Sequence, residues 1–352
     1  MKFSYFFLSI GMVSLFLLQT TFAADEGSHA AEFLSHGVGA RALGMGSAFV
    51  AIADDATATY WNPAGLTDVE NHSFSAMYSD TFGSSDGSFI TNGLVNYNFV
   101  NYVHQIEGIG SLGLSWIRLG IDDIPRTTFI DIDNNGKLGD YQDINGNGEK
   151  DTGEPYIDRP TVAGYFSNTD NALLISYARN IQSAISVGGS VKLLKQSIFD
   201  YSGSGFGIDL GFIFNPYKGI RLGTMLLDAT GTQIRWDTAD KPIFTRGRRL
   251  RVGGAYQFDV NRIGNGSISA DIETDQADYA EGADSGGGFI YRTGVEFWLF
   301  NTLALRTGWN GHGLSIGSGL QLSVTSMTFY VDYAFNSHTL GGSQRISVSG
   351  QF

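Results

Sequence analysis

Apolar and polar side chains alternate through most of the chain after residue 70. In residues 314–324, LSIGSGLQLSV, leucine, isoleucine and valine dominate one side of an extended backbone, while serine, glycine and glutamine dominate the other. Residues 206–214 and 327–335 repeat the pattern, with aromatic residues prominent on the apolar side. A strand that faces lipid on one side and a barrel lumen on the other alternates in this way. The periodicity therefore predicts membrane-spanning β-strands.

About fourteen segments have this character, an even number as expected for a bacterial outer-membrane barrel. They lie near residues 71–79, 89–101, 109–119, 171–180, 184–195, 204–214, 219–227, 247–258, 266–274, 287–298, 302–309, 313–324, 326–336 and 342–352. Short links then fall at one rim, and the long connections 120–170 and 228–246 fall at the other. The predicted fold class is all-β, a transmembrane antiparallel β-barrel of about 14 strands with a short N-terminal helical plug.

A β-sandwich or a β-propeller would alternate as well. The barrel is favoured because the polar side consists largely of glycine, serine and isolated charges of both signs, which suits a lumen better than a hydrated outer face. No blade-length repeat is visible. The chain ends RISVSGQF, and an amphipathic last strand that closes on Phe352 resembles the signal by which outer-membrane barrels are recognised for assembly.

Residues 1–23 have the features of a signal peptide: Lys2, an apolar run, and small residues before a cleavage site at Ala23. An uncut membrane anchor is the alternative. We expect a mature chain that begins at Ala24 and resides in the outer membrane of a Gram-negative-type bacterium. The expected division is a hatch or plug segment over 24–70 and a barrel over 71–352, with 121–169 as a long extracellular loop.

The segment 39–66, GARALGMGSAFVAIADDATATYWNPAGL, is small, apolar and helix-friendly, unlike the strands that follow it. Small residues allow close packing, so we expect a short helix that occupies the lumen as a plug. The acidic pair Asp54 and Asp55 follows the apolar run, and the helix should stop at Asn62-Pro63 because proline cannot continue it.

Charge and composition narrow the function. A net charge of −13 argues against nucleic acid as a partner. The chain has no cysteine and six scattered histidines, and no serine sits in a nucleophile elbow. We therefore expect a protein that is not an enzyme, with outer-membrane lipid around it.

The longest connection carries a calcium-like spacing in residues 131–158, DIDNNGKLGDYQDINGNGEKDTGEPYID. Oxygen ligands from one loop would be Asp143, Asn145, Asn147, the carbonyl of Glu149, Asp151 and Glu154, with Gly148 at the sharp turn. Asp131, Asp133 and Asn135 begin a second copy, in which Asp140 and Asp143 arrive one residue late. We expect Ca²⁺ as a cofactor of this loop; a solvated acidic loop with Gly-Asn turns is the alternative.

The segment 39–66 also resembles the N-terminal signature of the PorV/PorQ proteins, relatives of FadL-type outer-membrane transporters, and LALRTGW, VDYAF and RISVSGQF extend the likeness. The resemblance implies a fourteen-stranded barrel with an N-terminal hatch. It implies either a type IX secretion component that receives secreted proteins and contacts the secretion machinery, or a FadL-like passive transporter of hydrophobic ligands. Charges predicted on the lumen side and the acidic outer loop favour the secretion role as the first hypothesis. The 121–169 insertion departs from the compact family pattern.

Overall fold

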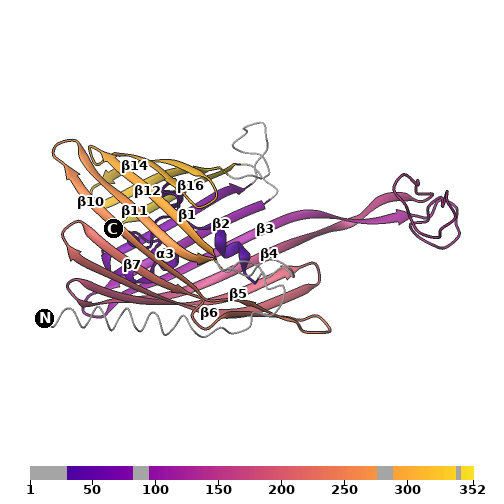
Figure 1. Cartoon of the computed structure of the whole chain (residues 1–352), viewed down its shortest axis with the longest axis horizontal. Coiled ribbons are helices and arrows are strands. Elements are labelled where there is room, and N and C mark those ends of the chain that lie inside the picture. Colours follow the sequence, from indigo (N-terminus) through magenta and orange to yellow (C-terminus); the bar gives the residue numbers. More distant parts are fainter. Residues whose placement is uncertain (1–29, 82–94, 276–287, 338–341) are drawn as a thin grey trace.

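The computed structural model describes residues 30–81, 95–275, 288–337 and 342–352, and it is a closed β-barrel (Figure 1). The strands of the ring are β1 (His72–Thr81), β2 (Val95–Ile106), β3 (Gly110–Ile130), β4 (Arg159–Gln182), β5 (Ile185–Ile198), β6 (Tyr201–Tyr217), β7 (Ile220–Leu227), β10 (Arg249–Val260), β11 (Gly264–Asp275), β12 (Gly288–Leu299), β13 (Leu303–Trp309), β14 (Leu314–Val324), β15 (Met327–Asn336) and β16 (Ser343–Gln351). The predicted signal peptide, residues 1–23, lies outside the described residues.

Neighbouring strands of the ring are antiparallel throughout, and β16 pairs with β1 to close it. Two further short strands, β8 (Thr232–Trp236) and β9 (Ile243–Arg246), form a hairpin that pairs with the outer part of β6. The ring itself therefore has 14 of the 16 strands. This confirms the predicted fold class of an antiparallel barrel.

Strand alternation places apolar side chains on the outside of the ring, as the sequence predicts. Exposed outward residues include Trp116 on β3, Leu193 on β5, Ile268 on β11 and Leu305 on β13. None of the helices in the described ranges is long and apolar enough to cross a membrane.

The two rims of the barrel differ. Links of two or three residues join β2 to β3, β4 to β5, β6 to β7, β10 to β11, β12 to β13 and β14 to β15 at one rim, which we call the short-turn end. The opposite rim, the long-loop end, carries the 131–158 and 228–248 connections. The longest connections thus lie at one rim, as the strand count predicts, although the short β5–β6 and β13–β14 links also lie there.

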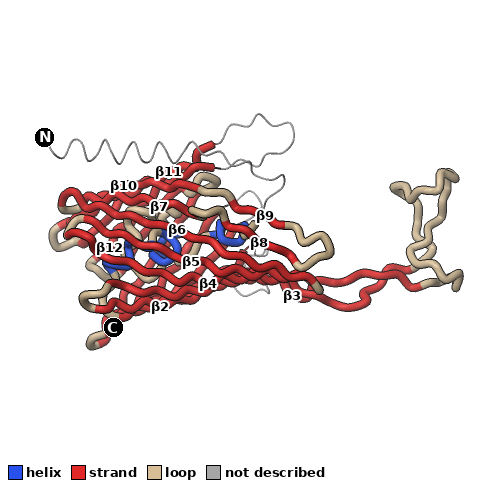
Figure 2. Tube along the Cα trace, turned by 90° about the horizontal axis from the view of Figure 1, so that it is seen from below, coloured by secondary structure: helices blue, strands red, loops and turns tan. Residues whose placement is uncertain are grey.

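The expected loop 121–169 is wrong in part, because much of it is strand. β3 continues to Ile130 and β4 begins at Arg159, so the two form a ribbon that projects beyond the rim (Figures 1 and 2). Their pairing continues through two irregularities, at Ile121/Ile124 and Arg126/Thr127. Alternation fails there because both faces of the ribbon are largely exposed, and no lipid or lumen imposes a period of two.

The hatch, defined here as residues 30–70, lies inside the ring (Figure 2). It contains η1 (Glu32–His36), α2 (Ala40–Gly44), α3 (Ala58–Trp61) and η2 (Pro63–Asp68). The expectation of one helix over this segment is wrong. The chain turns after Gly44, where Gly46 and Ser47 both have positive φ, because close contact with the wall on several sides replaces a single packing face.

Candidate functional site

Glycines on the lumen face let the backbone of the hatch contact the barrel wall. A Cβ added at Gly188 of β5 would lie 2.5 Å from the carbonyl carbon of Pro63, and one at Gly308 of β13 would lie 2.5 Å from the amide nitrogen of Gly46. Real Cβ atoms do not approach other atoms so closely, so a side chain at either position would displace the hatch. The abundance of glycine on the polar side of the strands thus reflects the presence of the hatch.

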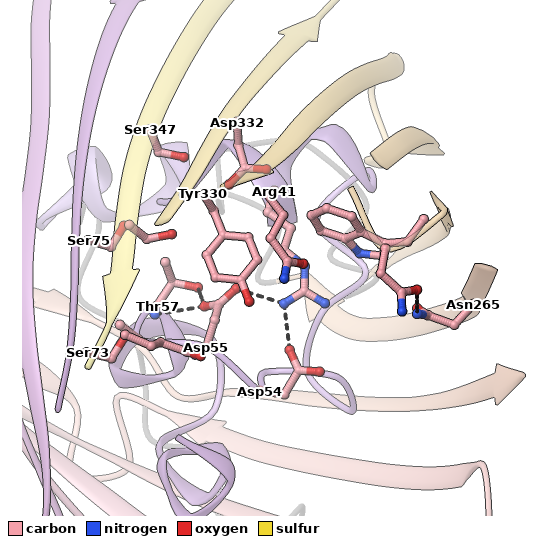
Figure 3. A pocket seen from close by; sticks show the side chains of 17 residues that line it. Arg41, Asp54, Asp55, Thr57, Ser73, Ser75, Asn265, Tyr330, Asp332 and Ser347 are labelled. Carbon is pink, nitrogen blue, oxygen red and sulfur yellow. Dashed lines mark hydrogen bonds and ion pairs between the residues drawn. The ribbon is translucent and has the colours of Figure 1, made fainter. Parts of the chain in front are cut away.

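Charged side chains anchor the hatch to one side of the wall. Arg41 of α2 donates to both carboxylate oxygens of Glu296 on β12, at 2.9 and 3.0 Å. It also donates to Asp54 at 2.6 Å (Figure 3). Arg306 of β13 joins the same Glu296 at 2.6 Å and Asp332 of β15 at 2.7 Å. Because the ion pairs of Glu296 and Arg306 are almost fully buried, removing one partner would leave a buried charge with less compensation.

Two more charge clusters continue this ionic side. Asp271 of β11 accepts the amide N–H groups of Phe49 and Val50 at 2.8 and 3.0 Å. Glu273, two residues along the same strand, is fully buried and receives arginine side chains from β10 and β12. These arginines are Arg249, Arg251 and Arg292.

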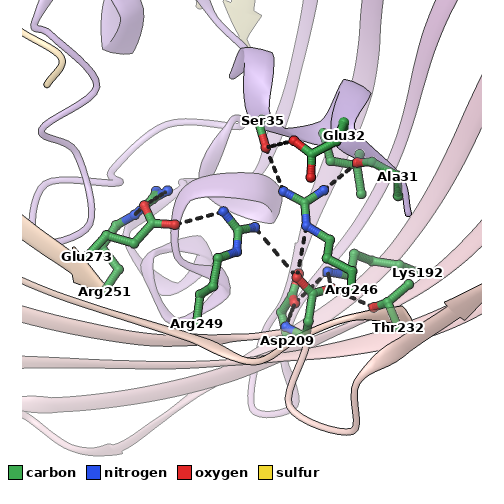
Figure 4. Close-up of polar contacts among 12 residues, drawn as sticks. Ala31, Glu32, Ser35, Lys192, Asp209, Thr232, Arg246, Arg249, Arg251 and Glu273 are labelled. Atoms are coloured by element: carbon green, nitrogen blue, oxygen red, sulfur yellow. Dashed lines mark hydrogen bonds and ion pairs between the residues drawn. The ribbon is translucent and has the colours of Figure 1, made fainter. Parts of the chain in front are cut away.

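A fourth cluster lies where the chain leaves β7 for the β8–β9 hairpin. Asp228 is fully buried with φ of 53°. It pairs with Lys192 of β5 and accepts the Thr232 hydroxyl, and both of these partners are labelled in Figure 4. Arg246 lies 3.4 Å from the Asp228 carboxylate and donates to Ser35 of η1 at 2.7 Å. This cluster fixes η1 to the wall near the long-loop end.

The opposite side of the hatch is apolar. We call it the apolar seam: a continuous set of buried side chains in which η1, α3 and η2 meet β2–β5. Its members are Phe33, Leu34, Trp61 and Leu66 of the hatch with Val95, Tyr97, Phe99, Val103, Ile117, Leu119, Ala172, Leu174, Ala178 and Leu194 of the wall. Among the described residues, the side-chain hydrogen bonds between the hatch and β2–β5 join neutral groups, as in the bond from the Ser115 hydroxyl to the Thr59 hydroxyl at 2.6 Å. The seam runs from Val95 near the long-loop end to Val103 near the short-turn end.

A polar cavity of about 370 Å³ lies between the hatch and the wall toward the short-turn end (Figure 3). Its lining combines hydroxyls, amides and carboxylates from the hatch and from β1, β12 and β14–β16. Arg41, Asp54, Asp55 and Tyr330 are among them. The lumen is therefore open and polar at one rim and filled with apolar and ionic contacts further in.

The four residues expected to form the plug all lie in the hatch. Asp54 and Asp55 line the polar cavity and pair with Arg41. Asn62 is fully buried, donates to the carbonyls of Val50 and Phe212, and caps η2 by accepting the Ala64 N–H. Pro63 starts η2 rather than ending a long helix.

The predicted calcium residues lie at the tip of the β3–β4 ribbon. Asp143 accepts the N–H groups of Gly146 and Gly148, and Glu154 accepts those of Ile144 and Asp151. Asn145 and Asn147 both donate to the Asp151 carboxylate, at 2.5 and 2.8 Å. Glu149 donates its N–H to Asn147.

The loop that begins at Asp131 comes first along the chain, and we call it the first loop; the loop that begins at Asp143 is the second loop. The first loop repeats the arrangement of the second with a different last residue. Asp131 accepts the N–H groups of Asn135 and Gly136, and Asp133 accepts that of Asn135. Asp158 accepts the backbone N–H groups of Ile132, Gly139 and Asp140. Glu154 plays the same part in the other loop, where it accepts those of Ile144 and Asp151. These bonds hold the pKa of Asp158 below its ordinary value.

Asp158, not Asp143, therefore completes the first loop, and its carboxylate lies within 4.8 Å of those of Asp131 and Asp133. Spacing alone missed Asp158 because it lies directly before β4, beyond the second loop. Asp158 is only 2% exposed, and this burial can be seen in the fold but not in the sequence.

Comparisons with known proteins find the fold but not a family. No protein-family model and no curated sequence matches the chain. Among solved structures, the chain is similar to the Pseudomonas putida toluene transporter TodX (TM-score 0.52, 14% identity, 89% of this chain and 96% of that chain). It is also similar to the Ralstonia pickettii toluene transporter TbuX (0.54, 13%, 90% and 98%) and to a Pseudomonas aeruginosa FadL homologue (0.50, 11%, 90% and 98%). The chain thus has the fold of FadL-type barrels over nearly its whole length.

Proposed function

We propose that this chain is a passive outer-membrane channel for small hydrophobic molecules, which cross the barrel along the apolar seam. The observation that carries the proposal is the two-sided attachment of the hatch. Buried ion pairs hold its α2 side to β12–β15 in addition to apolar contacts, whereas apolar packing and neutral hydrogen bonds hold its other side to β2–β5. Dispersion contacts have no fixed direction, so an apolar solute can replace them more readily than it can replace a buried ion pair.

The seam is also long enough to serve as a path through the barrel. Its wall residues run along most of the height of the barrel, from Val95 and Leu119 at the outer part to Val103 and Ala178 at the inner part. A solute that leaves the inner part would reach the rim where the polar cavity lies. In this structure the seam is closed, because Phe99, Ile117 and Leu174 are at most 1% exposed. Passage therefore requires side chains or the hatch to move.

The structural neighbours support this function over reception of exported proteins for type IX secretion. TodX and TbuX are described as toluene transporters, and none of the neighbours named above is described as a secretion component. The charges on the lumen side, which favoured the secretion hypothesis, are largely paired with one another and with the hatch. These paired charges leave the apolar seam without charged groups that would oppose the entry of a hydrophobic solute.

Uptake by cells tests the proposal. Cells with an intact outer membrane would be compared with and without expression of the chain, using labelled toluene and a labelled sugar of similar size. We expect expression to speed the entry of toluene and to leave the entry of the sugar unchanged. Equal toluene entry in both strains, or faster entry of the sugar, would contradict a hydrophobic channel.

A further inference from the structure

The β3–β4 ribbon carries a free sheet edge on β4. In the barrel wall β5 covers β4 as far as Asn168, which pairs with Ile198, and Phe199 adds a last bond from its N–H to the carbonyl of Ser167. Beyond that point, no described residue pairs with 159–166 on the β5 side. Unpaired N–H and C=O groups along an extended strand are a template for another strand.

The two strands of the ribbon differ in the features that hinder another strand from pairing with their free edges. On β3 this stretch contains Asp122, Asp123, Pro125 and Arg126, and charges, proline and bulges are the features that blunt an edge. On β4, Arg159 and Pro160 lie at the end nearest the tip, and Ala163 is the extra residue at the second irregularity, but residues 161–166, TVAGYF, contain no charge and no proline. The stretch 161–166 of β4 is thus better suited to accept a partner than the facing part of β3.

The surroundings of this edge are open and apolar. Val162 is 47% exposed and Tyr165 is 68% exposed. A Cβ added at Gly164 would meet nothing within 4 Å, so a backbone can approach the ribbon there. Six residues of uncharged edge, 161–166, correspond to a strand of roughly 20 Å, a usual length for a strand.

The acidic tip of the ribbon favours a partner that carries positive charge. Residues 131–158 contain eight carboxylates and two lysines. A strand added in line with β5 would be antiparallel to β4, so its C-terminal end would point toward this acidic tip. Basic residues at that end would be attracted to the acidic tip. A second copy of this chain would instead bring an uncharged edge and a second acidic tip, and the two acidic tips would repel one another.

We propose that the β4 edge at 161–166 binds an extended segment of another polypeptide by β-strand addition. The bound segment has an uncharged alternating stretch that lies along β4, and it has lysine or arginine at its C-terminal end. Main-chain hydrogen bonds give affinity in this mode, and the side chains at alternate positions and the acidic tip give specificity. The interaction surface lies outside the barrel and is independent of solute passage.

Synthetic peptides test the proposal on the full chain in nanodiscs, with fluorescence anisotropy as the readout. The probe is a peptide of alternating valine and threonine that ends in lysines, and its matched control is N-methylated at alternate backbone amides along one edge. We expect N-methylation to weaken binding by at least about tenfold, because it removes several main-chain hydrogen bonds. Moving the lysines to the N-terminal end should weaken binding as well.

Variants of the chain give the second arm. V162K with Y165K places two charges on the β4 edge and should weaken binding of the probe by about tenfold. T127K, on the β3 residue that pairs with Val162, adds a charge to the same ribbon and should change binding little. Equal binding of the methylated and parent peptides would overturn strand addition. Concentration-dependent dimers of the chain that exclude the probe would overturn the choice of partner.

Discussion

Arg41 in the hatch and Glu296 in the barrel wall form a two-bond ion pair, with N–O distances of 2.9 and 3.0 Å between residues 255 positions apart in the chain. Glu296 is almost fully buried and also receives Arg306. The hatch is therefore attached to β12 through a charge that has no access to solvent, while its other side meets β2–β5 through apolar packing.

Replacing Glu296 by glutamine should loosen the hatch without opening the ring. Two arginines, Arg41 and Arg306, would lose their shared carboxylate, and breaking a buried pair costs about 3 kcal/mol or more. We expect the amides of 39–53 to exchange hydrogen roughly a hundredfold faster. Glu70, exposed at the end of the hatch, offers the control Glu70→Gln. The same protection in Glu296→Gln and in the control would refute the anchoring role.

Adjacent glycines on β5 test the close contact between hatch and wall. Gly188→Ala would place a methyl group 2.5 Å from Pro63, whereas Gly189→Ala would meet its nearest atom at 3.4 Å, an ordinary contact. Overpacking costs about 1–3 kcal/mol, so the first variant should displace η2 and raise single-channel conductance. The second should behave like wild type. Equal conductance of the two variants would show that the hatch does not depend on this contact.

Calcium binding at the tip stays a prediction. Asp143 and Glu154 in one loop, and Asp131 and Asp158 in the other, supply the hard oxygen ligands that calcium prefers. Calcium should protect 131–158 from proteolysis, and Asp143→Ala combined with Glu154→Ala should remove most of the protection. Asp158→Ala should remove it from the first loop. Cleavage at the same rate with calcium and with a chelator would exclude the site.

The tip should also respond to acid through Asp158. The pKa of this carboxyl is lowered by N–H groups of Ile132, Gly139 and Asp140, which favour its charged form. Its contribution to the stability of the tip is therefore complete above the ordinary aspartate value of about 3.9 and is lost as pH falls through the lowered value. Proteolysis of 131–158 in calcium-free buffer should speed up at low pH. Asp158→Asn should cleave fast at both pH values; an unchanged pH profile in that variant would contradict the assignment.

The sequence predicts the barrel well because lipid and lumen impose a period of two on every spanning strand. Prediction from the sequence fails where a strand no longer lies between lipid and lumen. The outer parts of β3 and β4 leave the membrane-facing wall, so their residues do not alternate and resemble a loop.

The candidate site was less accessible to sequence reasoning. Arg41, Glu296 and Asp332 come from three distant segments, and no local pattern relates them. The glycines of the lumen face were visible as a composition, but only the fold shows that Gly188 and Gly308 face the hatch. Asp158 was missed because its partners in the first loop lie 18 or more residues before it.

The most direct measurement of the central claim is toluene uptake by cells that express seam variants. Leu174 of β4 is 1% exposed within the apolar seam. Leu174→Asn puts an amide in the proposed path, whereas Leu174→Met keeps it apolar at similar volume. With both variants assembled to the same extent, as judged by heat-modifiable migration, we expect uptake to fall to the level of cells without the chain for Leu174→Asn and to stay near wild type for Leu174→Met. Wild-type uptake by both variants would contradict passage along the seam.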